Sequence, residues 1–425
     1  KNSDLVINFE KTSNDNYLKL FDFMKSPLLL GNNNSVLDTF IDLKLDHEDY
    51  YFTTSFEIYE SLSGSNTDRY QYVLPAYSFT KSFDFNEENG SFQFGSSGSN
   101  VLHDANVVSS KIINDLNFTS LDSFSNKGLV NNFVILTRNI NSVGKNSIYY
   151  KNSPQSELIG MYNYNLSMPL RKNYKNIIDT LIPRASFKFN PNDMKNHASS
   201  GRRIDIGNIF APDRLGLGDS FETGESLTVG VDFIKERINE IDEIEEYLDF
   251  KLATVFRLKE EKNIPIGSTL NKKTSNIVGG INYKPNENIL LNYNFSLKNN
   301  LNTLEYNAIT SEFSLDNFST KFNYIEERGV IGNANIIENT TKYNFGEYNS
   351  FSFKTRRNRK LNLTEYYDLI YEYKNDCLIA DIKYRKDYYN DADIIPKEEL
   401  FFSITIVPFY TYSPDKMILN KDRID

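Results

Sequence analysis

The sequence contains no tryptophan, a single cysteine and three histidines among its 425 residues. The one cysteine, Cys377, cannot form a disulfide within the chain, and the scarcity of cysteine and histidine argues against a zinc-type metal site. The formal net charge of -10 argues against a broad surface for nucleic acid. With a mean hydropathy of -0.50, no stretch approaches the ~20 apolar residues of a membrane-spanning helix, which excludes a helical membrane protein.

Two segments alternate apolar and polar residues almost one for one. In residues 289–298 the odd positions are apolar, and in residues 318–324 the apolar side chains occupy even positions. Successive side chains of a β-strand point to opposite faces, so each segment makes one face of Tyr, Phe and Leu and one face of Asn, Ser and Lys. A closed sheet with lipid outside and water inside has this pattern.

Tyrosine and phenylalanine are abundant, with 28 and 31 residues respectively. Tyrosine suits a membrane interface because it combines an apolar ring with a polar hydroxyl group. AT-rich coding DNA raises Tyr together with Phe, Asn, Lys and Ile, so base composition is a second explanation of the same count. The sequence leaves both explanations open.

Strand-like runs continue along nearly the whole chain, separated by turn-like clusters of Asn, Gly, Ser, Asp and Pro such as 63–66 and 86–90. At roughly 20 to 25 residues for a strand and its turn, about 16 to 20 strands fit. We therefore predict an all-β fold, a large antiparallel transmembrane β-barrel over residues 1–410, incomplete in this chain, with a C-terminal tail at 411–425. Because residue 1 is not a methionine and the sequence becomes strand-like at once, we expect the chain to begin inside a longer protein.

One segment has helical spacing. Ile238, Ile241 and Ile244 recur within residues 237–247, surrounded by Glu and Asp, and this period fits a short amphipathic helix. A charged loop between two strands explains the same residues equally well, so both interpretations remain open.

Motifs for catalysis are missing from the sequence, which has no glycine-rich phosphate loop, no serine nucleophile elbow and no His-based metal spacing. His47, His103 and His197 are scattered in turn-like contexts and are interpreted as surface residues. The acidic segment 213–225 lacks the alternating carboxylates of an EF-hand loop, so a polar turn or a luminal loop is favoured over a calcium site. We expect no enzyme activity, no cofactor and no metal.

Two basic clusters occur, at 202–203 and at 356–360. Arginine and lysine there suit the phosphate or carboxylate groups of a lipid headgroup, and a solvated loop is the other interpretation. The single cysteine, Cys377, has the same strand parity as Asp381 and Lys383. That parity indicates a sulfur on the wet face, which fits a bonded or exposed thiol better than a core cysteine.

Three blocks of sequence, in collinear order over most of the chain and including 61–75, resemble the LptD family of outer-membrane lipopolysaccharide-assembly proteins. The first contains LIPRASF at 181–187, IDIGNIFAPDRL at 204–215 and ETGESLTVG at 222–230. The second contains PIGS at 265–268 and SNIVG at 275–279. The third, which is similar to the C-terminal barrel region of alphaproteobacterial members, contains LTEYYDLIYEY at 363–373, NDCL at 375–378, YRKD at 384–387 and the run 400–408.

The resemblance implies an outer-membrane barrel that inserts lipopolysaccharide into the outer leaflet. In such proteins a periplasmic jelly-roll domain receives the lipid from the periplasmic Lpt bridge, the lipoprotein LptE plugs the lumen, and the lipid leaves through a lateral seam between the first and last strands. We expect the jelly roll and the first strands to be missing from this chain, and the resemblance then implies that only the last strand represents the seam. Its residues are Leu400, Phe401, Phe402, Ser403, Ile404, Thr405, Ile406 and Val407.

The resemblance also implies a covalent partner for Cys377, because the family has a C-terminal cysteine there that bonds to the N-terminal domain. Many members have two adjacent cysteines, whereas Leu378 follows here, and this departure puts the full disulfide pattern in doubt. Pro408 closes the last strand-like run, and we interpret it as a strand terminator because it lacks an N–H group.

Two other classes of protein remain open. A porin, or a TonB-type receptor for a siderophore or sugar, would have the same barrel pattern. A soluble, secreted all-β binding protein would instead bury its apolar stripes between two sheets. Ion conductance without a lipoprotein partner would favour the first class, and solubility without detergent would favour the second.

Overall fold

The computed structural model describes residues 2–15, 36–63, 68–84, 90–104, 106–147, 150–238, 243–329, 332–388, 397–406, 410–412 and 417–421. Strands dominate these residues, together with a short 3₁₀ turn, η2 (Ile266–Ser268). A helix long and apolar enough to cross a membrane is not found among them. The prediction of an all-β fold is therefore confirmed.

Within the described residues, 24 strands form one sheet. The main strands contain from 9 to 16 residues, and a transmembrane strand needs about 9 to 11. In chain order the strands are β1 (Asn2–Asn8), β2 (Val36–Asp46), β3 (Tyr50–Ser61), β4 (Tyr70–Asp84), β5 (Ser91–His103), β6 (Val107–Thr119), β7 (Ser123–Phe124), β8 (Val130–Lys145), β9 (Gln155–Ser167), β10 (Leu170–Tyr174), β11 (Ile177–Asn190), β12 (Gly224–Ile238), β13 (Ile244–Arg257), β14 (Ile277–Asn286), β15 (Ile289–Leu297), β16 (Leu304–Leu315), β17 (Phe318–Arg328), β18 (Asn333–Phe345), β19 (Asn349–Asn358), β20 (Leu363–Lys374), β21 (Leu378–Asp387), β22 (Lys397–Ile406), β23 (Tyr410–Tyr412) and β24 (Met417–Lys421).

Consecutive strands pair in antiparallel fashion, so the sheet follows the order of the chain. The short strands β7 and β10 attach to β8 and β11, while β6 pairs directly with β8 and β9 with β11. The expected number of strands is too low, because many turns are shorter than we assumed. Asp316 and Asn317, for example, are the whole connection between β16 and β17.

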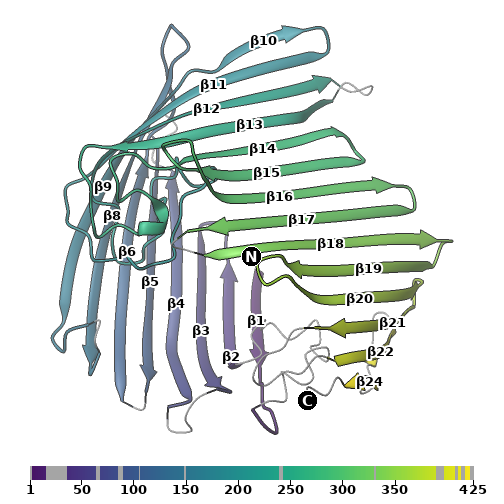
Figure 1. The fold of residues 1–425 in the computed structure, drawn as a ribbon. Helices are drawn as coiled ribbons and strands as arrows, with labels where there is room; N and C mark the ends of the chain where they lie inside the picture. The colour runs from purple at the N-terminus through teal and green to yellow at the C-terminus, as the bar shows by residue number, and fades with distance from the viewer. Residues whose placement is uncertain are drawn as a thin grey trace.

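The sheet curls around, with β1–β6 on one side of the molecule and β14–β22 running in another direction on the other side (Figure 1). At its two ends β1 pairs with β2, and β22 pairs with the short strands β23 and β24. Among the described residues, no pairing joins β1 to β22, β23 or β24. This is the sheet of a large antiparallel β-barrel whose first and last described strands are not joined to each other.

Two long connections fold back against the inner face of the sheet: 191–223 follows β11, and 258–276 follows β13. Phe221 of the first loop packs in a cluster with side chains of β8 and β9. The larger cluster joins both loops to inner-face residues of β13 and β14. It contains Met194, Ile204, Ile209, Leu215, Leu217, Ala253, Val255, Ile264, Leu270 and Val278. The chain's own loops therefore fill part of the lumen.

The two faces of the sheet differ in the way the alternating runs predicted. In β17, Glu327 faces the lumen because it binds Arg203 of the loop 191–223, so Phe322 and Tyr324 have the outward parity. The outward apolar side chains of this half of the sheet include Tyr293, Phe295, Phe313, Phe322, Tyr324, Phe351, Phe353, Leu369 and Tyr371. Where the loops cover them, β8, β9, β13 and β14 also have apolar residues on their inner faces. A simple division into an apolar outer face and a polar inner face did not predict these residues.

The helical interpretation of residues 237–247 is wrong for the residues that the structure describes. Ile238 ends β12 and Ile244 begins β13, and the two residues pair across a hairpin. Ile241 lies outside the described residues. The spacing of Ile238 and Ile244 arises because one ends a strand and the other begins the next, not because they share a helix face.

The two ends of the sheet differ in the length of their connections. We call them the loop end and the turn end. The loop end has the connections 9–35, 191–223 and 258–276, whereas the turn end has 287–288, 316–317, 346–348 and 375–377. In bacterial outer-membrane barrels the short turns are periplasmic and the longer loops are extracellular. This asymmetry therefore assigns the turn end to the periplasm and the loop end to the outside.

Candidate functional site

The loop 191–223 is fastened to the barrel wall by a buried ion network. Arg214 donates from Nε to Glu222 Oε2 at 2.7 Å and from Nη2 to Glu222 Oε1 at 2.7 Å. Arg257, the last residue of β13, donates to the same carboxylate. Arg214 also donates to the hydroxyl groups of Ser226 and Thr228 on the inner face of β12, at 3.0 and 2.8 Å. The loop therefore attaches to two strands through one carboxylate.

The buried cations around Glu222 lower the pKa of its carboxyl group. Burial alone raises the pKa of a carboxyl group, but the neighbouring cations, Arg214 first, outweigh burial and hold the pKa of Glu222 at about 2, below the ordinary 4.5. The carboxylate is therefore ionised at neutral pH. A buried ion pair with complete hydrogen bonds costs much more to break than an exposed pair, because a lone buried charge remains.

Backbone contacts complete the attachment of this loop. Lys188 of β11 is buried and donates from Nζ to the carbonyl oxygens of Ala211 and Pro212, at 3.0 and 2.6 Å. Further along the same wall, Arg138 of β8 donates to the carbonyl oxygen of Leu217 at 2.7 Å and stacks on the ring of Phe221 at 4.7 Å. The loop is thus held against the adjoining strands from β8 to β13.

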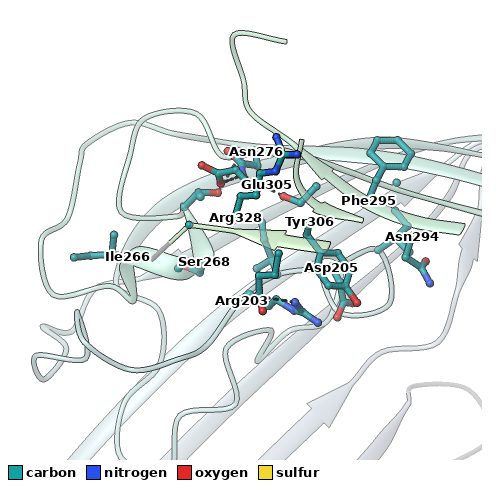
Figure 2. A pocket seen from close by; sticks show the side chains of 18 of the residues that line it. Arg203, Asp205, Ile266, Ser268, Asn276, Asn294, Phe295, Glu305, Tyr306 and Arg328 are labelled. Carbon is teal, nitrogen blue, oxygen red and sulfur yellow. Dashed lines mark hydrogen bonds and ion pairs between the residues drawn. The ribbon is translucent and has the colours of Figure 1, made fainter. Parts of the chain in front are cut away.

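A pocket lies between these loops and the inner wall of β14–β17 (Figure 2). It contains about 770 Å³ of space between side chains, including its open mouth. Arg203 lies over the ring of Tyr306 at 3.9 Å and bonds Glu327 at 3.2 Å. On the other side, Asn276 donates to Glu305 at 2.6 Å and to Ser296 at 3.1 Å.

The pocket has side chains of both charges beside apolar side chains, with a flat aromatic ring on one wall. Gly280 lies beside it, and an added Cβ there would lie 3.0 Å from Ile206 and 2.9 Å from the Asn294 amide oxygen, so these side chains would have to shift. The pocket offers amide, hydroxyl, guanidinium and carboxylate groups together with apolar contacts. This arrangement suits a group that presents both polar atoms and apolar surface.

The predicted seam residues occupy β22. Leu400, Phe402, Ile404 and Ile406 share one face, as the sequence predicted, with Phe401 and Ser403 on the other. Ser403 donates to Asp381 of β21. Val407 lies outside the described residues. The run is not the last strand of the sheet, because β23 and β24 follow and pair with it.

Cys377 lies in the turn 375–377 between β20 and β21, at the turn end, and is exposed. Its N–H group donates to the side chain of Asn375 at 3.0 Å. An exposed position agrees with the prediction of a bonded or exposed thiol rather than a core cysteine, and whether the sulfur is bonded stays a prediction. The strand-parity argument for it was wrong, because Cys377 is in a turn.

The other sequence-predicted residues divide between the lumen and the surface. Residues 213–223 of the acidic segment lie in a luminal loop, and residues 224–225 begin β12. The three histidines are half-buried rather than fully exposed, with side chains 22% exposed at His47 and His197 and 32% at His103. His197 bonds Asp219 at 2.8 Å. Of the pair at 202–203, Arg202 is exposed and Arg203 enters the pocket.

Sequence reasoning missed the ion network and the pocket. Arg214 and Glu222 lie within the segment 213–225, yet Arg257 is 35 residues beyond Glu222, and nothing in the local pattern connects them. The one local signal is a serine and a threonine on the wet face of β12, beside an Arg-containing loop. That signal has no spacing that would distinguish it from an ordinary polar strand.

A curled antiparallel sheet with an apolar outer face, a polar inner face and loops folded into its lumen defines an outer-membrane β-barrel. Residues 1–353 match the LptD family, described as LPS transport system D. The match covers more than half of the chain, so the chain belongs to the LptD family. Membership places it in the outer membrane and in lipopolysaccharide transport. The first two blocks of resemblance lie within the matched residues, and the third lies beyond them.

A comparison with curated proteins finds no match. Among solved structures, the chain is similar to the siderophore receptor PirA from Acinetobacter baumannii, with 8% identity and a TM-score of 0.40 over 87% of this chain and 71% of that one. It is also similar to the FrpB iron transporter from Neisseria meningitidis, with 10% identity and a TM-score of 0.37 over 88% and 73%. Likenesses this low carry no argument for a receptor function.

Proposed function

We propose that this chain is the membrane-embedded part of a lipopolysaccharide translocon and releases the lipid sideways into the outer leaflet. The observation that carries this proposal is the family match over residues 1–353. The sheet supports it physically, because a polar inner face suits the sugars and an apolar outer face suits the acyl chains. Transport of this kind makes and breaks no covalent bond, and we propose that the chain is not an enzyme.

We propose that the lateral seam follows β22. One edge of β22 has a continuous ladder of ten residue pairs with β21. Among the described residues, its other edge pairs with the short β23 and β24, and the register shifts between Glu398 and Glu399. An edge with few ladder bonds separates at lower cost than a full ladder. The outward residues Phe402 and Ile404 would then meet the acyl chains as they leave.

We propose three partners for this part of the barrel. Lipopolysaccharide is the cargo, and the lipoprotein LptE occupies the lumen beside the chain's own loops. The inner faces of β18–β21 support the LptE proposal, because ion pairs such as Arg356–Glu338 at 2.7 Å make a wet wall suited to a folded plug. The periplasmic Lpt bridge reaches the barrel through an N-terminal domain outside this chain. Exposure at the turn end supports a disulfide between Cys377 and that domain.

Depletion of the intact protein tests the transport role. We expect lipopolysaccharide to accumulate in the inner membrane or periplasm while its surface level falls. Unchanged surface lipopolysaccharide after depletion would contradict the proposal. Ion conductance of the purified barrel without a lipoprotein partner would then favour a porin or a receptor.

Site-specific photo-crosslinking tests the seam. A photoreactive residue at Ile404, outward on β22, should capture lipopolysaccharide in growing cells. The same residue at Phe313, outward on β16 and also nearer the turn end, is the matched control and should capture mainly other membrane lipids. Equal capture of lipopolysaccharide at both positions would refute a seam at β22.

A further inference from the structure

Four basic side chains gather at the loop end of β17–β20: Arg328, Arg357, Arg359 and Lys360. Arg357, Arg359 and Lys360 are exposed, and the side chain of Arg328 is 63% exposed. Arg328 follows the luminal Glu327 in β17, and Arg357 follows Arg356, which bonds luminal Glu338. Strand alternation therefore places Arg328 and Arg357 on the outer face. We call this set the basic rim.

Contacts between strands hold the basic rim together. Arg328 pairs with Asn333 in the β17–β18 ladder, and Lys360 donates from Nζ to the carbonyl oxygen of Asn333 at 3.4 Å. Arg328 and Arg359 both act electrostatically on the hydroxyl group of Tyr324, which faces outward. The four side chains thus belong to one surface and not to separate loops.

The charge of the basic rim is only partly balanced. Glu326 accepts hydrogen bonds from Arg328 at 2.9 and 2.5 Å, so this carboxylate balances one of the four cations. At the opposite, turn end of the same strands, the exposed charges are the acidic residues Asp316, Glu347 and Asp376 together with Lys374. The excess of positive charge is therefore a property of the loop end of these strands.

The basic rim lies directly above the apolar outer band. Arg328 is four residues beyond Tyr324, or about 13 Å along a strand that rises ~3.3 Å per residue. The apolar band of an outer-membrane barrel is about 25 Å tall, and Arg328 is six residues, or about 20 Å of tilted strand, beyond Phe322 near the middle of β17. Its guanidinium group therefore reaches the headgroup layer of the outer leaflet. Arg328 also borders the pocket of Figure 2. β19, which carries Arg357, lies three strand spacings, or about 14 Å, from β22, where we propose the seam.

We propose that the basic rim binds the phosphate groups on the headgroup of lipopolysaccharide in the outer leaflet. Arginine binds phosphate through two parallel hydrogen bonds, and lysine adds a point charge, so four cations in one surface suit a phosphorylated glycolipid. The proposal rests on the proposed function, because it names a contact for lipid that has just left through the seam. It assigns Arg357, Arg359 and Lys360 of the cluster at 356–360 to the lipid headgroup and not to a solvated loop, while Arg356 faces the lumen.

Lipid binding to the intact, detergent-purified protein tests the proposal. The variant combines Arg328→Ala, Arg357→Ala, Arg359→Ala and Lys360→Ala. The matched control combines Arg171→Ala, Lys172→Ala and Lys175→Ala, which removes exposed cations near the turn end. We expect the rim variant to bind phosphorylated lipid A at least about tenfold more weakly, as loss of several charged hydrogen bonds implies, and the control to bind as the parent does.

Lipid A stripped of its phosphates is the second probe. It should bind the parent protein as weakly as phosphorylated lipid A binds the rim variant. Equal binding of both lipids to the parent, or equal losses in the rim variant and the control, would overturn the proposal. All the substituted side chains are exposed. The heat-dependent gel mobility of the folded barrel shows whether each variant folds.

Different experimental results would overturn the basic-rim proposal and the proposed transport role. If depletion of the intact protein disturbs surface lipopolysaccharide and the rim variant binds phosphorylated lipid A normally, the rim proposal alone is wrong. If depletion leaves surface lipopolysaccharide unchanged, the transport role is wrong, whatever the rim binds.

Discussion

Glu222 and Arg214 form a two-bond ion pair inside the barrel, with both donor–acceptor distances at 2.7 Å. The side chain of Arg214 is fully buried and that of Glu222 is 3% exposed. Arg257 donates to the same carboxylate from β13. One acidic residue therefore decides whether the loop 191–223 remains against the wall or leaves two buried cations without a counter-charge.

The substitution Glu222→Gln should release this loop. Removing one partner of a buried ion pair costs about 3 to 5 kcal/mol, because the remaining charges stay buried. We expect amide hydrogen exchange in 191–223 to accelerate by about 100-fold or more. The matched control is Glu260→Gln, an exposed carboxylate in the loop 258–276, which should exchange as the parent does. Unchanged protection in the Glu222 variant would refute the anchoring role.

Acid should release the same loop within a defined pH window. The pKa of Glu222 is about 2 in the folded barrel and 4.5 in its ordinary state, so the folded state binds its proton less readily. The stability that Glu222 contributes is therefore complete above about pH 4.5 and is lost as pH falls toward 2. Exchange rates in 191–223 measured from pH 7 to 3 should stay level, after correction for intrinsic rates, until about pH 4.5. A loss between pH 7 and 5 would show that another group controls the loop.

A charged side chain on the outward face of β17 should destabilise the barrel. Phe322 faces lipid near the middle of the strand, and a charged residue at the bilayer midplane costs about 2 to 4 kcal/mol in a barrel. We expect Phe322→Arg to lower the stability of the barrel in lipid vesicles by that amount, measured by urea unfolding. Asn323→Arg, one residue further and facing the lumen, is the control and should cost much less. Equal losses would contradict the assignment of the two faces.

The turn end should face the periplasm. In intact cells carrying the protein, a membrane-impermeant maleimide should label an added cysteine at Asn300, in the exposed β15–β16 connection of the loop end. Cys377 should be labelled only after the outer membrane is permeabilised and disulfides are reduced. Labelling of Cys377 in untreated intact cells would reverse the orientation.

The strands were predictable because their signal is local. The runs at 289–298 and 318–324 became β15 and β17 with the expected faces, since side-chain alternation depends only on neighbouring residues. The wrong strand count and the helical interpretation at 237–247 have the same origin. Turns of two or three residues leave little trace in a pattern of period two, and Ile238 and Ile244 belong to two strands.

The candidate site was not predictable in the same way. The loop 191–223 contains Ile204, Ile209, Leu215 and Phe221, which resemble scattered apolar residues in a polar segment until the barrel wall is present. The pocket joins Arg203 to Tyr306 and Glu327, which are more than 100 residues away in the chain. The basic run at 356–360 was visible, but its meaning depended on the face and the end of the sheet.

The sequence by itself determined the all-β fold, the alternation of the strands and the likeness to LptD, because each depends on residue types read along the chain. Only the tertiary structure decided which loops enter the lumen, which carboxylate neutralises Arg214 and Arg257, and which end of the sheet carries the basic rim. Those features depend on the curl of the sheet, which brings distant inner faces together and sets the depth of every outward residue in the membrane. A pattern that repeats every two residues contains no information about that closure.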